Sequence, residues 1–361
     1  MSQRPSRVEL TALAADRHPF VVDASIGSPV DPPPAFVPHL LACQGEERAY
    51  PPAAGTPALV ESATRWFHAL RGVTLPDGAV APTMGSKEAI GTLAWLLRER
   101  RPDRGVVLIP GRAYPTYAEG ARAAGCEIVR VPDDCSGAPA FDAVAASVWD
   151  RTLVAWVNSP SNPTGAVYDP GPVVALAREH GAVLASDEAY GDFVWSGEAP
   201  SALRAGLEGT LALVSLSKRS NLAGLRLGLV AGDPMLVDEV VARRRALGLL
   251  ASGPSQAVAA EALADEGHVA EQRSRYAGRL RRLARVIEAV ADVPVRVPDG
   301  GIYLWVRAPD DDGAAFARWL ATRLGIVVAD GADYGDRAFV RIAATVKDRA
   351  IDALWERGGV R

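Results

Sequence analysis

The chain has 361 residues, of which 48% are hydrophobic and 23% are charged, and its formal net charge is −4. This composition is ordinary for a globular enzyme, and the negative balance gives no support to a partner that is a nucleic acid or an anionic membrane surface. No stretch reaches the roughly 18 apolar residues that a membrane-spanning helix needs. The N-terminal residues also lack the apolar segment of a signal peptide, so we expect a cytoplasmic protein.

Cysteines and histidines are sparse and form no recognisable site. The cysteines Cys43, Cys126 and Cys135 contain no C-x-x-C pair, and the five histidines show no H-x-x-x-H or H-E-x-x-H spacing. Metal sites and disulfide frameworks carry such spacings. We therefore expect free thiols and no bound metal.

From about residue 55 the sequence alternates between helical and strand-like segments. Residues 28–38, which come earlier, are too rich in proline for a helix or a central strand, so they predict an extended arm or linker. Strands that alternate with helices indicate βαβ units and a mostly parallel sheet flanked by helices. The expected helices cover 56–69, 88–100 and 173–180, and the expected buried strands cover 105–110, 152–157, 182–185 and 211–216.

After residue 233 consecutive helices are followed by short strands, which indicates a smaller α+β domain. We therefore predict an α/β fold with a large domain at 46–275. The small domain would consist of 276–361 together with 1–45, which includes an N-terminal arm. The expected helices of this part cover 235–250, 255–264, 269–290 and 312–324, and the expected strands cover 293–297, 301–306 and 339–343.

Polar residues gather where two of the predicted strands end, which is where ligands bind in open parallel sheets. Asn158-Ser-Pro-Ser-Asn-Pro-Thr-Gly165 follows one strand and forms a rigid turn, although a plain turn would read the same way. Asp187 follows the next strand. A buried carboxylate there needs a cation or hydrogen-bond donors, although a turn or cap residue is the ordinary alternative.

The strongest signal is Lys218, which we expect at the end of the strand 211–216. Ser215 and Ser217 precede it and Arg226 follows eight residues later. A buried lysine has a lowered pKa and can offer a neutral amine for Schiff-base chemistry. The two hydroxyls and the arginine can bind a phosphate. An isolated lysine, however, usually faces solvent.

A further segment, Gly85-Ser86-Lys87, lies directly before the helix 88–100. Gly85 permits close approach of the backbone, and Ser86 is expected to be the N-cap. The free N–H groups and the positive end of the helix dipole can hold a phosphate, although a bare helix cap explains the pattern equally well. Lys87 and Arg219 are basic and near these segments, and either can simply face solvent.

Read together and in order, these segments resemble the class I and II aminotransferases, which are fold-type I pyridoxal-5′-phosphate (PLP) enzymes. The motifs are S-N-P-T-G, then D-E-x-Y, then S-x-S-K followed by an arginine, and the resemblance covers nearly the whole chain. It implies PLP as cofactor and transfer of an amino group between an α-amino acid and a 2-oxo acid. It also implies a homodimer with shared active sites.

The resemblance assigns roles residue by residue. Lys218 would hold PLP as a Schiff base and move a proton, Asp187 would pair with the pyridine nitrogen, and Asn162 and Tyr190 would hydrogen-bond the ring oxygen O3′. Tyr114 would stack on the cofactor ring. The phosphate would be bound by Ser215, Ser217 and Arg226, by the backbone of Gly85, Ser86 and Lys87, and by Tyr50 of the neighbouring subunit. For the substrate, the resemblance implies binding by Asn162, recognition of the α-carboxylate by Arg341, and a pocket lined by Gly27.

A finer resemblance is to the N-succinyldiaminopimelate aminotransferases. It rests on the segments around Asn162 and Lys218, on Gly27-Ser-Pro-Val-Asp-Pro, and on Tyr303-Leu-Trp. Two features depart from that group: the loop before Arg341 is short, and residues 301–305 offer no group for a distal carboxylate.

Other chemistry stays open at this point. A PLP enzyme of secondary metabolism could catalyse elimination, replacement, decarboxylation or carbon–carbon bond formation on the same scaffold. A PLP-domain regulator of transcription is disfavoured, because no helix-turn-helix pattern precedes the large domain.

Overall fold

The computed structural model of the chain describes residues 4–43, 49–134 and 137–359. Its helices are α1 (Arg7–Ala15), α2 (Phe36–Cys43), α3 (Pro57–Arg71), α4 (Ser86–Arg98), α5 (Thr116–Ala123), α6 (Ala146–Trp149), α7 (Gly171–Glu179), α8 (Leu216–Arg219), α9 (Pro234–Ala246), α10 (Gly253–Ala264), α11 (Gly267–Ala291), α12 (Gly313–Leu324) and α13 (Asp348–Gly358). Its strands are β1 (Val22–Asp23), β2 (Val80–Thr83), β3 (Val106–Pro110), β4 (Glu127–Val131), β5 (Thr152–Asn158), β6 (Val183–Asp187), β7 (Thr210–Ser215), β8 (Gly228–Gly232), β9 (Tyr303–Arg307), β10 (Ile326–Val327), β11 (Ala329–Asp330) and β12 (Phe339–Ala343).

The largest sheet has the strand order β2-β8-β7-β6-β5-β3-β4, and only β8 runs antiparallel to its neighbours. Successive side chains of a strand point to opposite faces. Accordingly, Val107 and Ile109 of β3 pack with α4, α5 and α9, whereas Val106 and Leu108 pack on the other face with residues of α6 and α7. Helices therefore cover both faces, and the predicted α/β class is confirmed.

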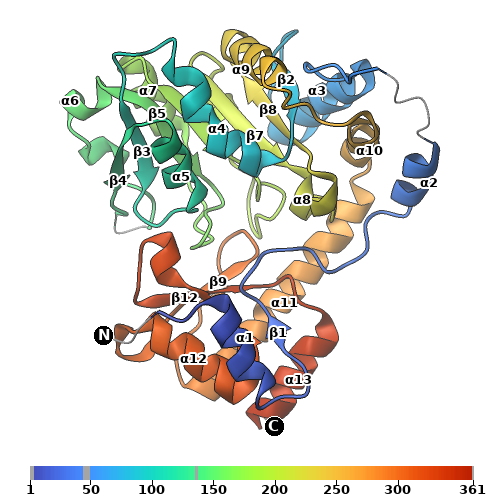
Figure 1. Cartoon of the computed structure of the whole chain (residues 1–361), viewed down its shortest axis with the longest axis vertical. Coiled ribbons are helices and arrows are strands. Elements are labelled where there is room, and N and C mark those ends of the chain that lie inside the picture. Colours follow the sequence, from blue (N-terminus) through green and yellow to red (C-terminus); the bar gives the residue numbers. More distant parts are fainter. Residues whose placement is uncertain (1–3, 44–48, 135–136, 360–361) are drawn as a thin grey trace.

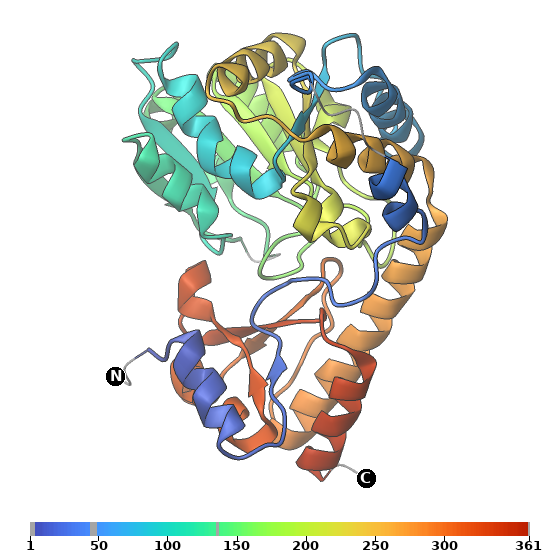
Figure 2. The same cartoon turned by 45° about the vertical axis from the view of Figure 1, so that its right-hand side comes forward.

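A second core lies in the other part of the molecule, where α1, α11, α12 and α13 pack around β9 and β12. These strands form an antiparallel sheet with β11, and β1 pairs with β10. Figures 1 and 2 show α11 running between this part and the part that holds the large sheet. The predicted division into domains near residues 45 and 275 stays a prediction: the first boundary lies outside the described residues, as does Cys135, and the second lies inside α11.

Two expectations about local structure are wrong. Residues 293–297 form no strand, since Val293 and Val295 pack against the core without a pairing partner and Pro294 offers no N–H group. Residues 28–38 are not extended throughout, because α2 begins at Phe36. Pro38 is tolerated there since the first turn of a helix needs no N–H donor from it.

Within the ranges that the structure describes, no helix combines the length and the apolar character that crossing a bilayer requires.

The segment between β1 and α2 is held against α11 by a buried ion pair. Arg279 donates to both carboxylate oxygens of Asp31 at 2.6 and 2.7 Å, and Gln272 donates to the same carboxylate at 2.9 Å. The Arg279 side chain is only 3% exposed. Because this segment contains Ser25, Ile26 and Gly27, which line the cavity at the strand ends, the pair also helps to hold one wall of that cavity.

Arg279→Ala is expected to lower the free energy of unfolding by about 3 kcal/mol, because it leaves the Asp31 carboxylate partly buried without its cation. The measurement is chemical denaturation of the purified protein. Arg282→Ala is the matched control, since Arg282 also pairs with Asp348 but is one-third exposed, and its loss should cost less than about 1 kcal/mol. Equal effects of the two substitutions would contradict this account of the pair.

Candidate active site

A cavity of about 350 Å³ lies at the carboxyl ends of β5, β6 and β7. Twelve of the residues named from the sequence line it: Gly27, Ser86, Lys87, Tyr114, Asn162, Asp187, Tyr190, Ser215, Ser217, Lys218, Arg226 and Arg341. Gly85 and Tyr50 do not line it. Six further lining residues were given no role from the sequence: Ser25, Ile26, Ile90, Ala189, Tyr303 and Tyr334.

The strand ends come together because of the parallel register. Asn158 of β5 pairs with Asp187 of β6, so the loops after these strands start side by side. The Asn158 side chain then ties the loops together: its amide donates to the carbonyl of Asp187 at 2.8 Å, and its oxygen accepts from the N–H of Asn162 at 2.7 Å. This arrangement places Asn162 and Asp187 on the same cavity.

Lys218 lies in the one-turn helix α8 and not at the end of the strand as expected, because β7 ends at Ser215. The Ser215 hydroxyl accepts from the N–H of Ser217 at 3.2 Å and so begins the turn. Burial, followed by the positive charges of Arg341 and Arg226, lowers the pKa of Lys218 to about 8. No hydrogen bond or ion pair of its amine occurs among the described residues.

Asp187 is 4% exposed, and burial raises its pKa to about 6. The carboxylate accepts from the Tyr117 hydroxyl at 2.7 Å and from the N–H of Ala189 at 3.1 Å, and both bonds oppose that rise. Tyr117 is itself stacked on Trp156. Asp187 has no cationic partner in the part of the chain that the structure describes. A buried carboxylate with donors but no cation fits a ligand that brings a positive charge.

The N-terminus of α4 provides a site for an anion. Gly85 is the N-cap, with φ of 84°, and no side chain caps this end, so the expected cap at Ser86 is wrong. Arg226 lies over this end: a Cβ atom on Gly85 would come within 2.8 Å of its Nη2. Free N–H groups, the helix dipole and a guanidinium together favour a phosphate.

Arg341 forms a second, separate cation site. It donates to the Asn162 oxygen at 2.9 Å and to the Ser25 carbonyl at 2.8 Å, and its Cζ lies 4.0 and 4.3 Å from the ring centroids of Tyr303 and Tyr334. Its Nε is buried without a hydrogen-bond partner. This guanidinium therefore has donor capacity left for a carboxylate.

The two basic residues near the site behave differently. Arg219 is completely buried and pairs with Asp192 at 3.1 Å and with Glu266 at 2.5 Å, so it does not face solvent. Lys87 is exposed and nevertheless lines the cavity. Tyr50 is 93% exposed and contributes nothing to the cavity of its own chain.

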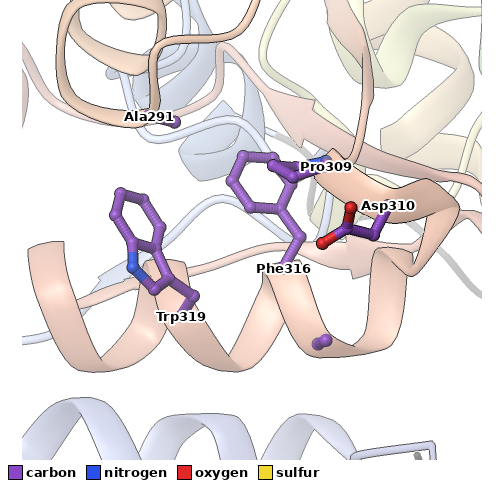
Figure 3. Close-up of a pocket in the computed structure, with 6 residues that line it drawn as sticks. Ala291, Pro309, Asp310, Phe316 and Trp319 are labelled. Carbon is purple, nitrogen blue, oxygen red and sulfur yellow. The ribbon is translucent and has the colours of Figure 1, made fainter.

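A cavity of similar size, about 390 Å³, lies between α11 and α12 and is lined by Pro309, Asp310, Phe316 and Trp319, among others (Figure 3). Its walls are mostly apolar, and Asp310 is the one charged residue that lines it. It offers no cation for a phosphate and no amine, so it does not fit PLP.

The cavity at the strand ends does fit PLP. The cofactor carries a phosphate, a protonated ring nitrogen and an aldehyde. The uncapped end of α4 beside Arg226, the buried carboxylate of Asp187 and the amine of Lys218 match these three groups in charge and in chemistry.

The family model described as aminotransferase class I and II matches residues 26–357. The chain is 38% identical to 4-dedimethylamino-4-oxo-anhydrotetracycline transaminase of Streptomyces rimosus, over 95% of this chain and 94% of that protein. It is 32% identical to an LL-diaminopimelate aminotransferase of Dehalococcoides mccartyi, over 92% of this chain and 89% of the relative.

Solved structures of similar proteins superpose along the whole chain. A probable N-succinyldiaminopimelate aminotransferase of Thermus thermophilus has a TM-score of 0.86 at 30% identity, covering 98% of both chains. An aminotransferase of Neisseria meningitidis has a TM-score of 0.88 at 28% identity, covering 100% of this chain and 98% of that one. The chain therefore belongs to the class I and II aminotransferases, a family of PLP-dependent enzymes.

Proposed function

We propose that this aminotransferase binds PLP through Lys218, Asp187 and the α4 terminus, and that it takes α-amino acids and 2-oxo acids whose carboxylate binds Arg341. The observation that carries the proposal is one cavity that holds a half-buried amine, a buried carboxylate and two guanidinium groups. None of these four side chains has an ion-pair partner among the described residues. Charged groups left unpaired in one cavity are expected where a charged ligand completes them.

Different residues would bind different groups of the cofactor. Ser215, Ser217, Arg226 and the backbone of Gly85, Ser86 and Lys87 would hold the phosphate, Asp187 would hold the ring nitrogen, Tyr114 would cover the ring, and Asn162 and Tyr190 would contact its oxygen O3′. When bound, PLP supplies an electron sink for the carbon that carries the amino group.

Lys218 is suited to move a proton at that carbon. A general base works best when its pKa lies near the pH at which the enzyme acts, and a pKa of about 8 leaves roughly a tenth of the amine neutral at pH 7, far more than an ordinary lysine would offer. Arg341, already oriented by Asn162 and by the two tyrosine rings, would hold the substrate α-carboxylate in a fixed place relative to this amine.

The names of two similar proteins support one candidate amino donor and one candidate class of amino acceptor. N-succinyldiaminopimelate is supported by the name of the Thermus thermophilus neighbour, at 30% identity. A bulky ring ketone as amino acceptor is supported by the name of the Streptomyces rimosus relative, at 38% identity. Beside Arg341 the cavity walls are tyrosines, which accommodate a large apolar substrate and provide no cation for a second carboxylate.

We further propose a homodimer in the cytoplasm in which Tyr50 reaches the phosphate site of the neighbouring subunit. Support comes from the nearly complete exposure of Tyr50 on its own chain. The ring and hydroxyl of Tyr50 are therefore accessible to a second subunit.

The low pKa of Lys218 has a directly measurable consequence. The sequence contains only three lysines, Lys87, Lys218 and Lys347. An amine reacts with an acylating reagent only when neutral, so labelling of Lys218 in cofactor-free protein should reach half its maximal rate near pH 8 and fall at lower pH. Peptide mass spectrometry follows each lysine separately, with Lys347 as internal reference. A midpoint for Lys218 above about pH 10 would contradict burial of the amine.

The proposed function is tested by a half-reaction in which amino acids convert the bound cofactor to its amine form, followed by absorbance. Wild-type protein should show this conversion. Arg341→Ala should raise the amino acid concentration for half-maximal conversion roughly 100-fold, because charged hydrogen bonds to the carboxylate are lost.

Arg112→Ala is the matched control, since Arg112 pairs with Asp133 and Asp336 and does not line the cavity. For an amine that lacks a carboxylate, the concentration for half-maximal conversion should be the same in the wild type and in Arg341→Ala. No conversion by any amino acid would remove the proposed substrate class, and an unchanged half-maximal concentration in Arg341→Ala would place carboxylate recognition elsewhere.

The shared site is tested with hybrid dimers of Lys218→Ala and Tyr50→Ala subunits, purified through two affinity tags. If Tyr50 serves the neighbouring subunit, one site of the hybrid carries both substitutions and the other carries none. The hybrid should then show about half the wild-type activity at limiting cofactor, well above either parent. If Tyr50 serves its own chain, both sites of the hybrid are impaired and no activity is recovered.

A further inference from the structure

Tyr303, which was given no role from the sequence, contacts two of the residues with proposed roles. Its hydroxyl lies 2.9 Å from the hydroxyl of Tyr190, and the two rings meet edge to face with centroids 5.6 Å apart. Tyr303 is 3% exposed and Tyr190 is 6% exposed. Neither hydroxyl has another hydrogen-bond partner among the described residues, so each is held by the other.

The ring of Tyr303 also covers the guanidinium of Arg341, whose Cζ lies 4.0 Å from the ring centroid. This contact follows from the sheet: Arg341 of β12 pairs with Trp305 of β9, which places Tyr303 diagonally opposite Arg341 on the same face. A position on a strand is set more tightly than a position on a loop.

Gly27 leaves the space that the Tyr303 hydroxyl occupies. A Cβ atom at position 27 would lie 2.1 Å from that oxygen and 2.9 Å from the ring carbon that bears it. Gly27 is not among the glycines with positive φ, so its backbone conformation is open to other residues. The position therefore needs the absence of a side chain, and what it makes room for is Tyr303.

We propose that Tyr303 is a positioning residue for two groups at once: its hydroxyl orients the hydroxyl of Tyr190 toward the cofactor, and its ring orients Arg341 toward the substrate. This rests on the proposed function, in which Tyr190 contacts O3′ of PLP and Arg341 binds the α-carboxylate.

The hydroxyl acts through the direction of hydrogen bonding. A phenol has one hydrogen to donate, and its oxygen can accept. When Tyr303 donates to the Tyr190 oxygen, the Tyr190 hydrogen is left for O3′, and a donor that is itself accepting a hydrogen bond donates more strongly. A stronger bond stabilises the anionic form of O3′ and so lowers the pH at which the bound cofactor loses its proton.

The first test is Tyr303→Phe in the holoenzyme, read by the pH midpoint of the visible absorbance of the bound cofactor. The midpoint should rise by about 0.3 to 1 unit, which is the size expected for loss of one neutral hydrogen bond acting through a neighbour. Tyr334→Phe is the matched control, because the Tyr334 ring also lies over Arg341 while its hydroxyl makes no bond to Tyr190. That variant should leave the midpoint in place.

A double-substitution cycle shows whether the effect passes through Tyr190. Tyr190→Phe alone should raise the midpoint by more than Tyr303→Phe does, and adding Tyr303→Phe to it should change nothing further. Gly27→Ala offers an independent route, since its added methyl group must displace the Tyr303 hydroxyl, and the midpoint should again rise.

The ring contact is tested by comparing Tyr303→Leu with Tyr303→Phe. Loss of the ring over Arg341 should raise KM for the amino acid about 3- to 10-fold in the leucine variant, while the phenylalanine variant keeps the wild-type KM. Thermal unfolding of both variants shows whether either has lost its fold.

The outcomes separate this inference from the proposed function. If Tyr190→Phe moves the midpoint and Tyr303→Phe does not, Tyr303 only fills space and the inference is overturned, while the role of Tyr190 stands. If neither variant moves the midpoint, the role of Tyr190 fails and the inference fails with it. Equal KM values in both Tyr303 variants would overturn the contribution of the ring.

Discussion

The structure depends on keeping charged side chains buried in one cavity without pairing them to each other. Asp187 carries a carboxylate, Lys218 an amine and Arg341 a guanidinium, and in the described residues none of these forms an ion pair. Unpaired burial costs several kcal/mol per ion, and the pKa values respond in the expected directions, upward for Asp187 and downward for Lys218. Both shifts reduce the charge that these two side chains carry, and a ligand with the opposite charges would remove the reason for the shifts.

Two parts of the fold must meet to build this cavity. The parallel register of β5, β6 and β7 brings Asp187 and the turn before Lys218 to one edge of the large sheet. Arg341 and Tyr303 come from β12 and β9 of the small sheet, and Gly27 comes from the segment that Asp31 fastens to α11. The Asp31–Arg279 pair thus acts on the site from a distance, because it holds the backbone that leaves room for Tyr303.

The sequence predicts those site residues that directly follow a buried strand, because the apolar run of the strand marks their position. Apolar runs followed by polar residues identified Asp187 and Lys218, because a strand that is buried on both faces ends where polar side chains begin. The same reasoning put Lys218 on the strand itself, since a one-turn helix such as α8 has no periodicity to detect. No role was assigned to Tyr117 or Tyr303 from the sequence, because their partners, Asp187 and Tyr190, lie 70 and 113 residues away in the chain. The hydropathy pattern of the sequence indicates that a side chain is buried, but only the three-dimensional fold determines which side chains it contacts.

The cavity also keeps its two anion sites distinct. Arg226 is exposed and sits over the uncapped end of α4, where backbone N–H groups and the helix dipole add to its charge. Arg341 is buried, lies against the rings of Tyr303 and Tyr334, and has two N–H groups already engaged. The first environment favours a dianion that accepts several hydrogen bonds, whereas the second favours a planar monoanion. The phosphate of the cofactor would therefore bind at Arg226 and the carboxylate of the substrate at Arg341, because the first site can still provide more hydrogen-bond donors than the second.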